Sequence, residues 1–287
     1  EKPMCVADRA VVRPVAAKGY TARPEPSGPG AGEGLDRRGC AGASPRGRAP
    51  AVEPGAKYKV QGTLPRPFYS PLVVVAHKSA AGVLAASGLA TLDAAHRGIL
   101  KMAAYLDAAR ADRTWQQLKG AGKYGELTGT LYLSSTDPET SNSGALYLAA
   151  ASYVANGGKV VASPAEVDGT APLLHELVSV QGAQQSSTDA AFRDFVSGAG
   201  NPLVLVYESQ VASLLANGRQ PGDLVVLYPD TTVDSDHTAV PLTEDGSAVA
   251  RLLATDPALR RLEIRHGFRP QGVTAEFASA TTYLKQE

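Results

Sequence analysis

The chain has 287 residues, of which 44% are apolar and 20% are charged, and its Lys and Arg residues equal its Asp and Glu residues in number. This composition is typical of a globular protein that is long enough for two lobes, each with its own core. The formal net charge of +0 gives no electrostatic reason to expect nucleic acid or an anionic membrane as a partner.

The beginning of the chain bears on location and redox state. The longest apolar runs are far shorter than the roughly 20 residues of a membrane span. No apolar h-region follows residue 3, so we expect either a cytosolic protein or an exported one whose signal peptide is absent from this chain. Cys5 and Cys40 lack the spacing of metal ligands, and they are equally compatible with a disulfide and with two separate thiols.

The first half of the chain predicts a helix, an irregular segment and a buried strand. Residues 1–20 have helical spacing, whereas residues 24–55 are so rich in Gly and Pro that they cannot bury enough apolar surface to offset their ordering entropy. The apolar run 72–76 is typical of a strand buried on both faces, as in a parallel sheet covered by helices. Helical stretches are expected within 79–89 and 94–109, with glycine stops at Gly88 and Gly98. We expect Trp115 to pack in the core, because large aromatic side chains mostly do so.

A polar loop between a strand and a helix is the most informative stretch. Residues 131–133 have strand character, residues 134–144 are mostly hydroxyl and amide side chains, and a helix follows. The apolar face expected for this helix is Ala145, Leu146, Leu148, Ala149, Ser152 and Tyr153. The loop side chains either cap the helix or, with its unpaired N–H groups, bind an oxyanion or polar ligand. The local chemistry by itself favours capping.

The second half of the chain continues the alternation of strands and helices, which predicts an α/β fold. Ser187 is the natural N-cap of a helix over 189–196. The remaining expected elements are a helix at 172–180, strands at 203–206 and 224–228, a helix at 211–216, a loop at 234–238, and helices at 246–254 and 256–266, the last ended by Gly267.

Six segments, in order, resemble a family of bacterial extracellular solute-binding proteins. They are PFYSPLVVVAH (67–77), STD…SNSG (135–144), QGAQQSS (181–187), LVLVYESQ (203–210), VVLYPDTTVDSDHTAVPL (225–242) and HGFRP (266–270). This family is built like the class II periplasmic binding proteins, which include molybdate and sulfate binders. The resemblance covers roughly residues 57–270 and is specific as a set.

The resemblance implies a two-lobe α/β fold of the class II periplasmic-binding-protein type, with crossing hinge strands at 72–76 and 203–206. Lobe 1 would contain residues 1–76 and 203–287, and lobe 2 residues 77–202. It implies capture of a small polar solute, with an oxyanion among the candidates, in an interlobe cleft for a membrane permease or sensor. The location would be extracellular or periplasmic, after export, with a lipid anchor as one option.

Polar turns at the ends of apolar strands supply the candidate ligand-binding residues, because ligands bind at such ends in open α/β sheets. They are Ser70, Thr136, Ser141, Asn142, Ser143, Ser186, Ser187, Tyr207 and Glu208. The resemblance assigns ligand contacts to 141–143 and to Tyr207. The alternative for Tyr207 is packing with a satisfied hydroxyl. The alternative for Glu208 is a hinge hydrogen bond, since a free carboxylate would repel an oxyanion.

Enzymatic motifs are missing from the sequence. It has no G-x-S-x-G elbow, no H-E-x-x-H helix, no P-loop and no framed dinucleotide fingerprint, and its five histidines lack metal-ligand spacing. We therefore expect no enzyme, no metal site and no cofactor. The alternative to a solute receptor is an interaction module of the same fold with a degenerate cleft and no transported ligand.

Overall fold

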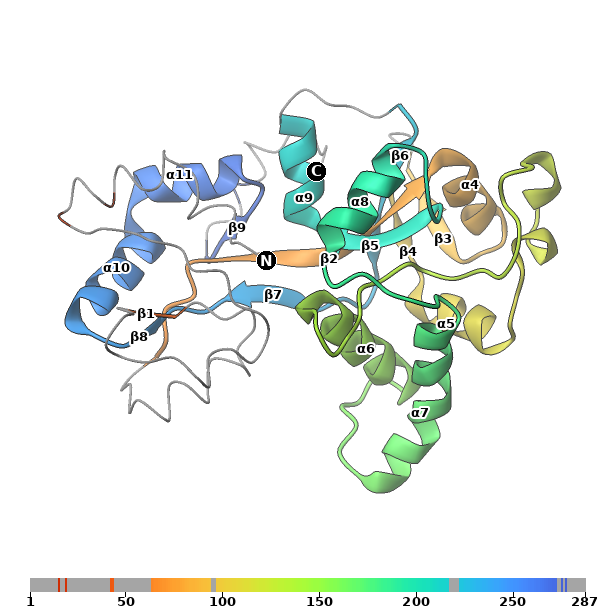
Figure 1. The fold of residues 1–287 in the computed structure, drawn as a ribbon, viewed down its shortest axis with the longest axis horizontal. Helices are drawn as coiled ribbons and strands as arrows, with labels where there is room; N and C mark the ends of the chain where they lie inside the picture. Colours follow the sequence, from red (N-terminus) through yellow and green to blue (C-terminus); the bar gives the residue numbers. More distant parts are fainter. Residues whose placement is uncertain are drawn as a thin grey trace. The chain divides into compact units, whose positions relative to one another are not determined.

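The computed structural model describes residues 15, 19, 42–43, 63–93, 97–216, 222–272, 275 and 277. The chain forms two compact units: unit 1 contains Glu1–Pro71, Glu208–Arg219 and Asp234–Glu287, and unit 2 contains Leu72–Tyr207 and Gln220–Val233. The α/β class with two units is confirmed (Figure 1). The predictions for the two cysteines, for most of 1–20 and for 24–55 apart from 42–43 lie outside the described residues.

Unit 2 is built on a mixed sheet with the strand order β3, β4, β6, β2, β5. The strands are β2 (Phe68–His77), β3 (Ala90–Leu92), β4 (Arg97–Leu100), β5 (Leu203–Tyr207) and β6 (Leu224–Pro229). β2 pairs antiparallel with both β5 and β6, while β4 and β6 pair in parallel. The run 72–76 is buried on both faces as predicted, although its neighbours on both sides are antiparallel and not parallel. Burial on both faces depends on the layers that cover a sheet and not on strand direction.

Helices and one continuous apolar core complete unit 2. The helices are α4 (Lys78–Ala86), α5 (Met102–Arg110), α6 (Asn142–Ala155), α7 (Pro164–Ser179) and α8 (Thr188–Val196), with 3-10 turns η2 (Trp115–Gln117) and η3 (Ala121–Lys123). α4 contacts β3 and β6, α6 and α8 contact β5, and α5, α6 and α7 pack against one another (Figure 1). Trp115 is buried in this core, as predicted.

Several of the expected elements differ from the structure in this unit. The helical stretches predicted over 94–109, with a stop at Gly98, are from Arg97 onward β4 followed by α5. Gly98 lets β4 approach β3 closely, because a Cβ on Gly98 would lie 1.8 Å from the Thr91 carbonyl oxygen. The helix predicted after the polar loop is confirmed as α6, but its expected buried face is wrong. Its buried residues are Ser143, Gly144, Tyr147, Ala150 and Ala151. α6 is apolar nearly all round, so its periodicity could not select the buried face.

Unit 1 combines short strands with helices α9, α10 and α11 among its described residues. Its elements are β1 (Gly42–Ala43), α9 (Glu208–Ala216), β7 (Asp234–His237), β8 (Val240–Pro241), α10 (Glu244–Thr255), α11 (Pro257–Arg265) and β9 (Arg269–Pro270). The first residues of β2 pair with β7 and with β9, so the loop predicted at 234–238 is instead mostly a strand. Phe68, Leu259 and Phe268 form a buried cluster with Val15, and the His237 ring centroid lies 4.6 Å from that of Phe68.

The chain passes from one unit to the other after Pro71, Tyr207, Arg219 and Val233. The expected division cut the chain at residues 76 and 203 and assigned everything after 203 to lobe 1. The structure instead assigns 72–76, 203–207 and 220–233 to unit 2. The reason is strand pairing: β6 lies between β2 and β4 in the sheet of unit 2, which a linear division of the sequence cannot anticipate.

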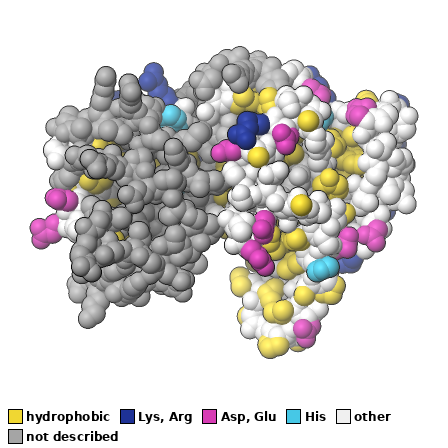
Figure 2. All heavy atoms as spheres, viewed as in Figure 1, with side chains coloured by type: hydrophobic (Ala, Val, Ile, Leu, Met, Phe, Trp, Pro, Cys, Tyr) yellow, Lys and Arg dark blue, Asp and Glu magenta, His cyan; other side chains and the backbone are white. Residues whose placement is uncertain are grey.

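The described surface carries a few exposed apolar side chains. Tyr153, Val160 and Val167 are exposed at the end of α6, in the following link and in α7, and apolar atoms are visible at this end of unit 2 in Figure 2. Apolar side chains exposed singly are normal on a protein surface and need no ligand to explain them. Among the described residues, no helix is both long and apolar enough to span a membrane.

Candidate functional site

Three hydroxyl groups meet at the start of α6, and we call Thr136, Ser141 and Ser143 the hydroxyl cluster. Ser143 Oγ lies 2.7 Å from Thr136 Oγ1 and 2.9 Å from Ser141 Oγ. The three residues are at most 3% exposed. Two mutual hydrogen bonds use two of the three hydroxyl protons, so one proton remains for an acceptor outside the cluster.

Ser141 occupies the N-cap position of α6 without capping it. Its backbone is extended, with φ of −131°, yet its side chain makes no capping hydrogen bond, because the hydroxyl points to Ser143. The first turn of a helix presents backbone N–H groups without intrahelical acceptors and the positive end of the helix dipole. Ser187 provides the contrast within the same unit. It caps α8 as predicted, accepting a hydrogen bond from the Asp189 N–H at 3.2 Å.

Gly144 allows the polar loop to lie directly against α6. A Cβ at this position would be 2.2 Å from the Thr136 carbonyl oxygen and 2.8 Å from the Pro138 nitrogen. Both are backbone atoms, so no side-chain movement could relieve the clash. The glycine of the SNSG segment is therefore required by this close approach, which brings Thr136 within hydrogen-bonding distance of Ser143.

Two buried tyrosines fix the entry to the loop. The Leu133 N–H donates to the Tyr105 hydroxyl at 2.9 Å, and the Tyr147 hydroxyl donates to the same oxygen at 3.5 Å. Burial raises the pKa of Tyr105 to about 12, although its two hydrogen bonds oppose the rise, and burial raises the pKa of Tyr147 as well. Both hydroxyls therefore stay protonated at neutral pH.

The strand predicted at 131–133 is wrong, because only a single parallel bridge forms beside β5. The Ser134 N–H donates to the Leu203 carbonyl at 3.0 Å, and the Leu205 N–H donates to the Ser134 carbonyl at 2.8 Å. The chain then leaves β5 and enters the loop. A three-residue apolar run has too few positions to distinguish a strand from extended backbone.

Asn142 and Tyr207 connect α6 to the end of β5. Asn142 Nδ2 donates to the Tyr207 hydroxyl at 3.3 Å, and Tyr207 is 5% exposed. This bond gives Tyr207 a satisfied hydroxyl, which fits the packing alternative. It also places a phenol oxygen beside the first turn of α6, and both side chains belong to unit 2.

The two candidates in unit 1 have structural partners there. Glu208 is fully buried, and Arg269 donates to both of its carboxylate oxygens, from Nε and Nη2, each at 2.7 Å. This bidentate ion pair neutralises the carboxylate that would otherwise repel an oxyanion. The Ser70 hydroxyl accepts from the Ser209 N–H at 3.1 Å, which satisfies one N–H in the first turn of α9.

The candidate residues thus fall into separate groups. Thr136, Ser141, Asn142, Ser143 and Tyr207 form hydrogen-bonded contacts in unit 2. Ser187 caps the neighbouring helix α8, and Ser186 is exposed before it.

Sequence reasoning missed the roles of Gln181, Gln184 and Arg269. Both glutamines hydrogen-bond to the polar loop, and Arg269 neutralises Glu208. The available signal was position: the glutamines stand just before a predicted N-cap, and the arginine belongs to the HGFRP segment of the resemblance.

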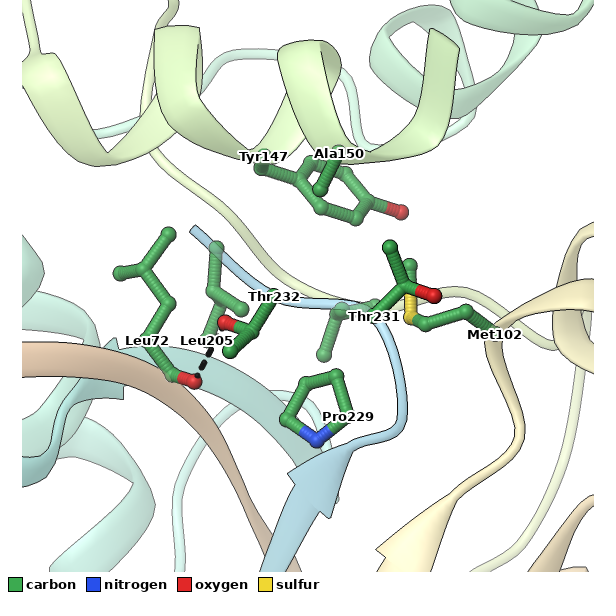
Figure 3. A pocket seen from close by; sticks show the side chains of 9 residues that line it. Leu72, Met102, Tyr147, Ala150, Leu205, Pro229, Thr231 and Thr232 are labelled. Carbon is green, nitrogen blue, oxygen red and sulfur yellow. Dashed lines mark hydrogen bonds between the residues drawn. The ribbon is translucent and has the colours of Figure 1, made fainter. Parts of the chain in front are cut away.

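A pocket below α6 has a different character. It is a shallow space whose empty volume of about 250 Å³ includes open solvent, and Figure 3 shows Tyr147 and Ala150 of α6 on one side of it. Its walls are nearly all apolar, and the Thr232 hydroxyl donates to the Leu72 carbonyl at 3.0 Å. The lining residues are Leu72, Met102, Leu133, Tyr147, Ala150, Leu205, Pro229, Thr231 and Thr232. Such walls suit a polar solute poorly.

Potential metal ligands are scattered through the described residues. No group of three or more His, Cys, Asp or Glu side chains in that part of the chain is arranged to hold a metal ion. The chemistry that the hydroxyl cluster offers is hydrogen bonding by neutral donors.

Comparisons with known proteins give weak structural likenesses. No protein-family model matches the sequence, and no curated protein matches it. The sulfate-binding protein SubI from Mycobacterium tuberculosis H37Rv is 17% identical, with a TM-score of 0.48 over 82% of this chain and 69% of that one. Apo FutA2 from Synechocystis PCC6803 is 14% identical, with a TM-score of 0.43 over 75% of this chain and 61% of that one. Likenesses at these scores carry no conclusion about function.

Proposed function

We propose that this protein is an extracytoplasmic solute-binding protein that captures a small polar solute for a membrane permease or sensor. The observation that carries the proposal is the hydroxyl cluster at the N-terminus of α6, where Ser141 occupies the N-cap position but turns its hydroxyl to Ser143. A side chain that only capped the helix would accept from a backbone N–H of the first turn.

The donors around the start of α6 set the chemistry of the solute. Hydroxyl protons, the Asn142 amide and the backbone N–H groups of the first turn donate without carrying a full charge. They suit an acceptor-rich solute, with oxyanions first among the candidates. Support also comes from the ordered set of segments that resembles the extracellular solute-binding family. We assign ligand contacts to Thr136, 141–143 and Tyr207.

Three other candidate residues have hydrogen-bond partners that account for their polarity without a ligand. Glu208 and Ser70 have partners within unit 1 that account for their polarity, and Ser187 caps α8. We propose these three as supporting residues and not as direct ligand contacts. Ser186 is exposed before α8, so we assign it no role in the site.

Thermal unfolding with a panel of solutes tests the proposal. Sulfate, phosphate, molybdate, amino acids and sugars are each added over a range of concentrations. A ligand of the folded protein raises the melting temperature in a saturable way, since the stabilisation is RT ln(1 + [L]/Kd). A panel without any saturable shift would contradict the proposal. It would favour the alternative of an interaction module with a degenerate cleft.

A further inference from the structure

The segment 181–185, between α7 and α8, holds the beginning of the polar loop through Ser135. The Ser135 N–H donates to Gln181 Oε1 at 2.7 Å, and Gln181 Nε2 donates to the Ser135 hydroxyl at 3.0 Å. Gln184 Nε2 donates to the same hydroxyl at 3.0 Å. The backbone and side chain of one loop residue are therefore both bound by the two glutamines.

The peptide unit between Thr136 and Asp137 is held on both sides. Gln184 Nε2 donates to the Thr136 carbonyl oxygen at 3.1 Å, and the Asp137 N–H donates to the Gln185 carbonyl oxygen at 3.0 Å. A peptide unit is planar, so two bonds on opposite edges fix its rotation about the chain. The Thr136 side chain is attached next to this peptide unit. Fixing the rotation of the peptide therefore also fixes the direction of the Thr136 hydroxyl toward Ser143.

The Thr136 carbonyl also faces the first turn of α6. A Cβ on Gly144 would lie 2.2 Å from this oxygen, so the carbonyl occupies the space that the glycine leaves. Carbonyl oxygens only accept hydrogen bonds, so the Gln184 amide must turn its nitrogen toward Thr136. A carboxylate or an apolar side chain at this position could not replace that donor.

We propose that Gln184 is a positioning residue for the hydroxyl cluster. It acts through the Thr136–Asp137 peptide, which it orients so that the Thr136 hydroxyl meets Ser143 and the cluster faces the start of α6. Its importance for binding rests on the function proposed above, whereas its effect on the loop does not.

Substitutions at two neighbouring glutamines provide a matched test. Gln184→Leu removes the amide at similar volume, and Gln184→Glu keeps the shape but replaces the donor by an acceptor. Gln185→Leu and Gln185→Glu are the controls, because the contact from Gln185 is through its backbone oxygen and its side chain is exposed. All four proteins are compared with the wild type by far-UV circular dichroism to establish that they fold.

The first measurement is amide hydrogen exchange without ligand, followed by NMR. Gln184→Leu removes the hydrogen bonds from the Gln184 amide to the Ser135 hydroxyl and the Thr136 carbonyl. We expect the loop to open more often as a result, so that the Ser135 and Asp137 amides lose about tenfold in protection. The Leu205 amide and both Gln185 variants should match the wild type. Gln184→Glu should regain protection near pH 4, where a protonated carboxyl again donates. Unchanged protection in Gln184→Leu would overturn the proposal.

The second measurement is the dissociation constant for sulfate by calorimetry, since sulfate accepts from hydroxyls and from N–H groups at helix N-termini. We expect Gln184→Leu to raise it about tenfold, while the Gln185 variants stay near the wild type. Faster exchange with unchanged sulfate affinity would overturn the positioning role. If the wild type binds neither sulfate nor any panel solute, the proposed function fails. The exchange data alone then decide whether Gln184 holds the loop.

Discussion

Ser141 shows how little a residue's position says about its partner. It stands where an N-cap stands and has the extended backbone of one, yet its hydroxyl serves the hydroxyl cluster. Thr136 and Ser143 are equally buried and equally dependent on one another. Removing one hydroxyl from such a set leaves its neighbours without a partner, which costs more than the loss of an exposed hydrogen bond.

We expect Ser141→Ala to weaken solute binding by about 1 to 3 kcal/mol, in addition to the folding stability that the ligand-free protein loses when its buried hydroxyl cluster is broken. Asn142→Ala should weaken binding to a similar degree, since its amide lies in the first turn of α6. The control is Ser163→Ala, because Ser163 is a true N-cap: it accepts from the Glu166 N–H at 3.3 Å. That variant should lose about 0.5 to 2 kcal/mol of folding stability and keep its affinity.

Calorimetry for binding and denaturant titration for stability, on the same proteins, separate the two effects. Intact affinity together with lowered stability in Ser141→Ala would remove this residue from the site.

Glu263 gives unit 1 a predictable pH dependence. It is 1% exposed, and neither of its carboxylate oxygens has a hydrogen-bond partner within the described part of the chain. Burial raises its pKa from 4.5 to about 8, with Arg260 opposing part of the rise. Below pH 4.5 the side chain is neutral in both folded and unfolded chains. As pH rises from 4.5 toward 8, only the unfolded chain loses the proton, so folding stability falls.

We therefore expect the wild type to lose about 1.4 kcal/mol of unfolding free energy per pH unit between about pH 5 and 8 from this group. Glu263→Gln should remove that slope. Glu244→Gln, at an exposed position in α10, should retain it. Denaturant titrations at pH 5 and pH 8 measure the difference. Equal slopes in all three proteins would show that Glu263 is ionised or hydrated in the folded state.

At the scale of elements, two glycines in helices of unit 2 have opposite requirements. Gly144 in α6 faces backbone oxygen, whereas Gly169 in α7 has open space where a Cβ would be. A glycine inside a helix costs stability relative to alanine unless a close approach needs it.

We expect Gly144→Ala to be destabilising and to separate the polar loop from α6, because the added Cβ would meet the Thr136 carbonyl oxygen. Gly169→Ala should stabilise the protein by about 0.4 to 1 kcal/mol. Melting temperatures of the two variants give the signs, and solute affinity should fall only in Gly144→Ala. A gain in stability for both would mean that the loop moves away from the helix without cost.

At the scale of the molecule, the described residues form a separate apolar core in each unit, which suggests two unfolding steps. The only tryptophan of the chain, Trp115, is buried in the core of unit 2. Glu263, in contrast, is buried in unit 1. Probes that report different units need not change together when a protein has more than one core.

We expect the fluorescence of Trp115 to follow unit 2 alone, while far-UV circular dichroism follows both units. The two transitions in denaturant should not coincide, and Glu263→Gln should shift the circular dichroism curve without moving the fluorescence midpoint. Coincident curves that shift together in the variant would show instead that the two units unfold as one.

The sequence by itself determined the α/β class, the helices that follow the polar loop and the 181–187 turn, the burial of 72–76, and the cap at Ser187. These features depend on local spacing and on side-chain chemistry near the backbone, which a linear pattern contains. It also pointed to 141–143, because hydroxyls and an amide before an apolar helix are a local signal.

Tertiary structure decided the antiparallel direction of β2, the buried face of α6, the strand β7 and the chain positions at which one unit ends and the other begins. It also decided that Ser141 bonds to Ser143, that Arg269 neutralises Glu208 and that Gln184 holds Thr136. Each of these depends on groups that are distant along the chain or on a choice between equally apolar faces. Hydrophobic periodicity indicates which residues of an element are buried. It contains no information about the residues that pack against them.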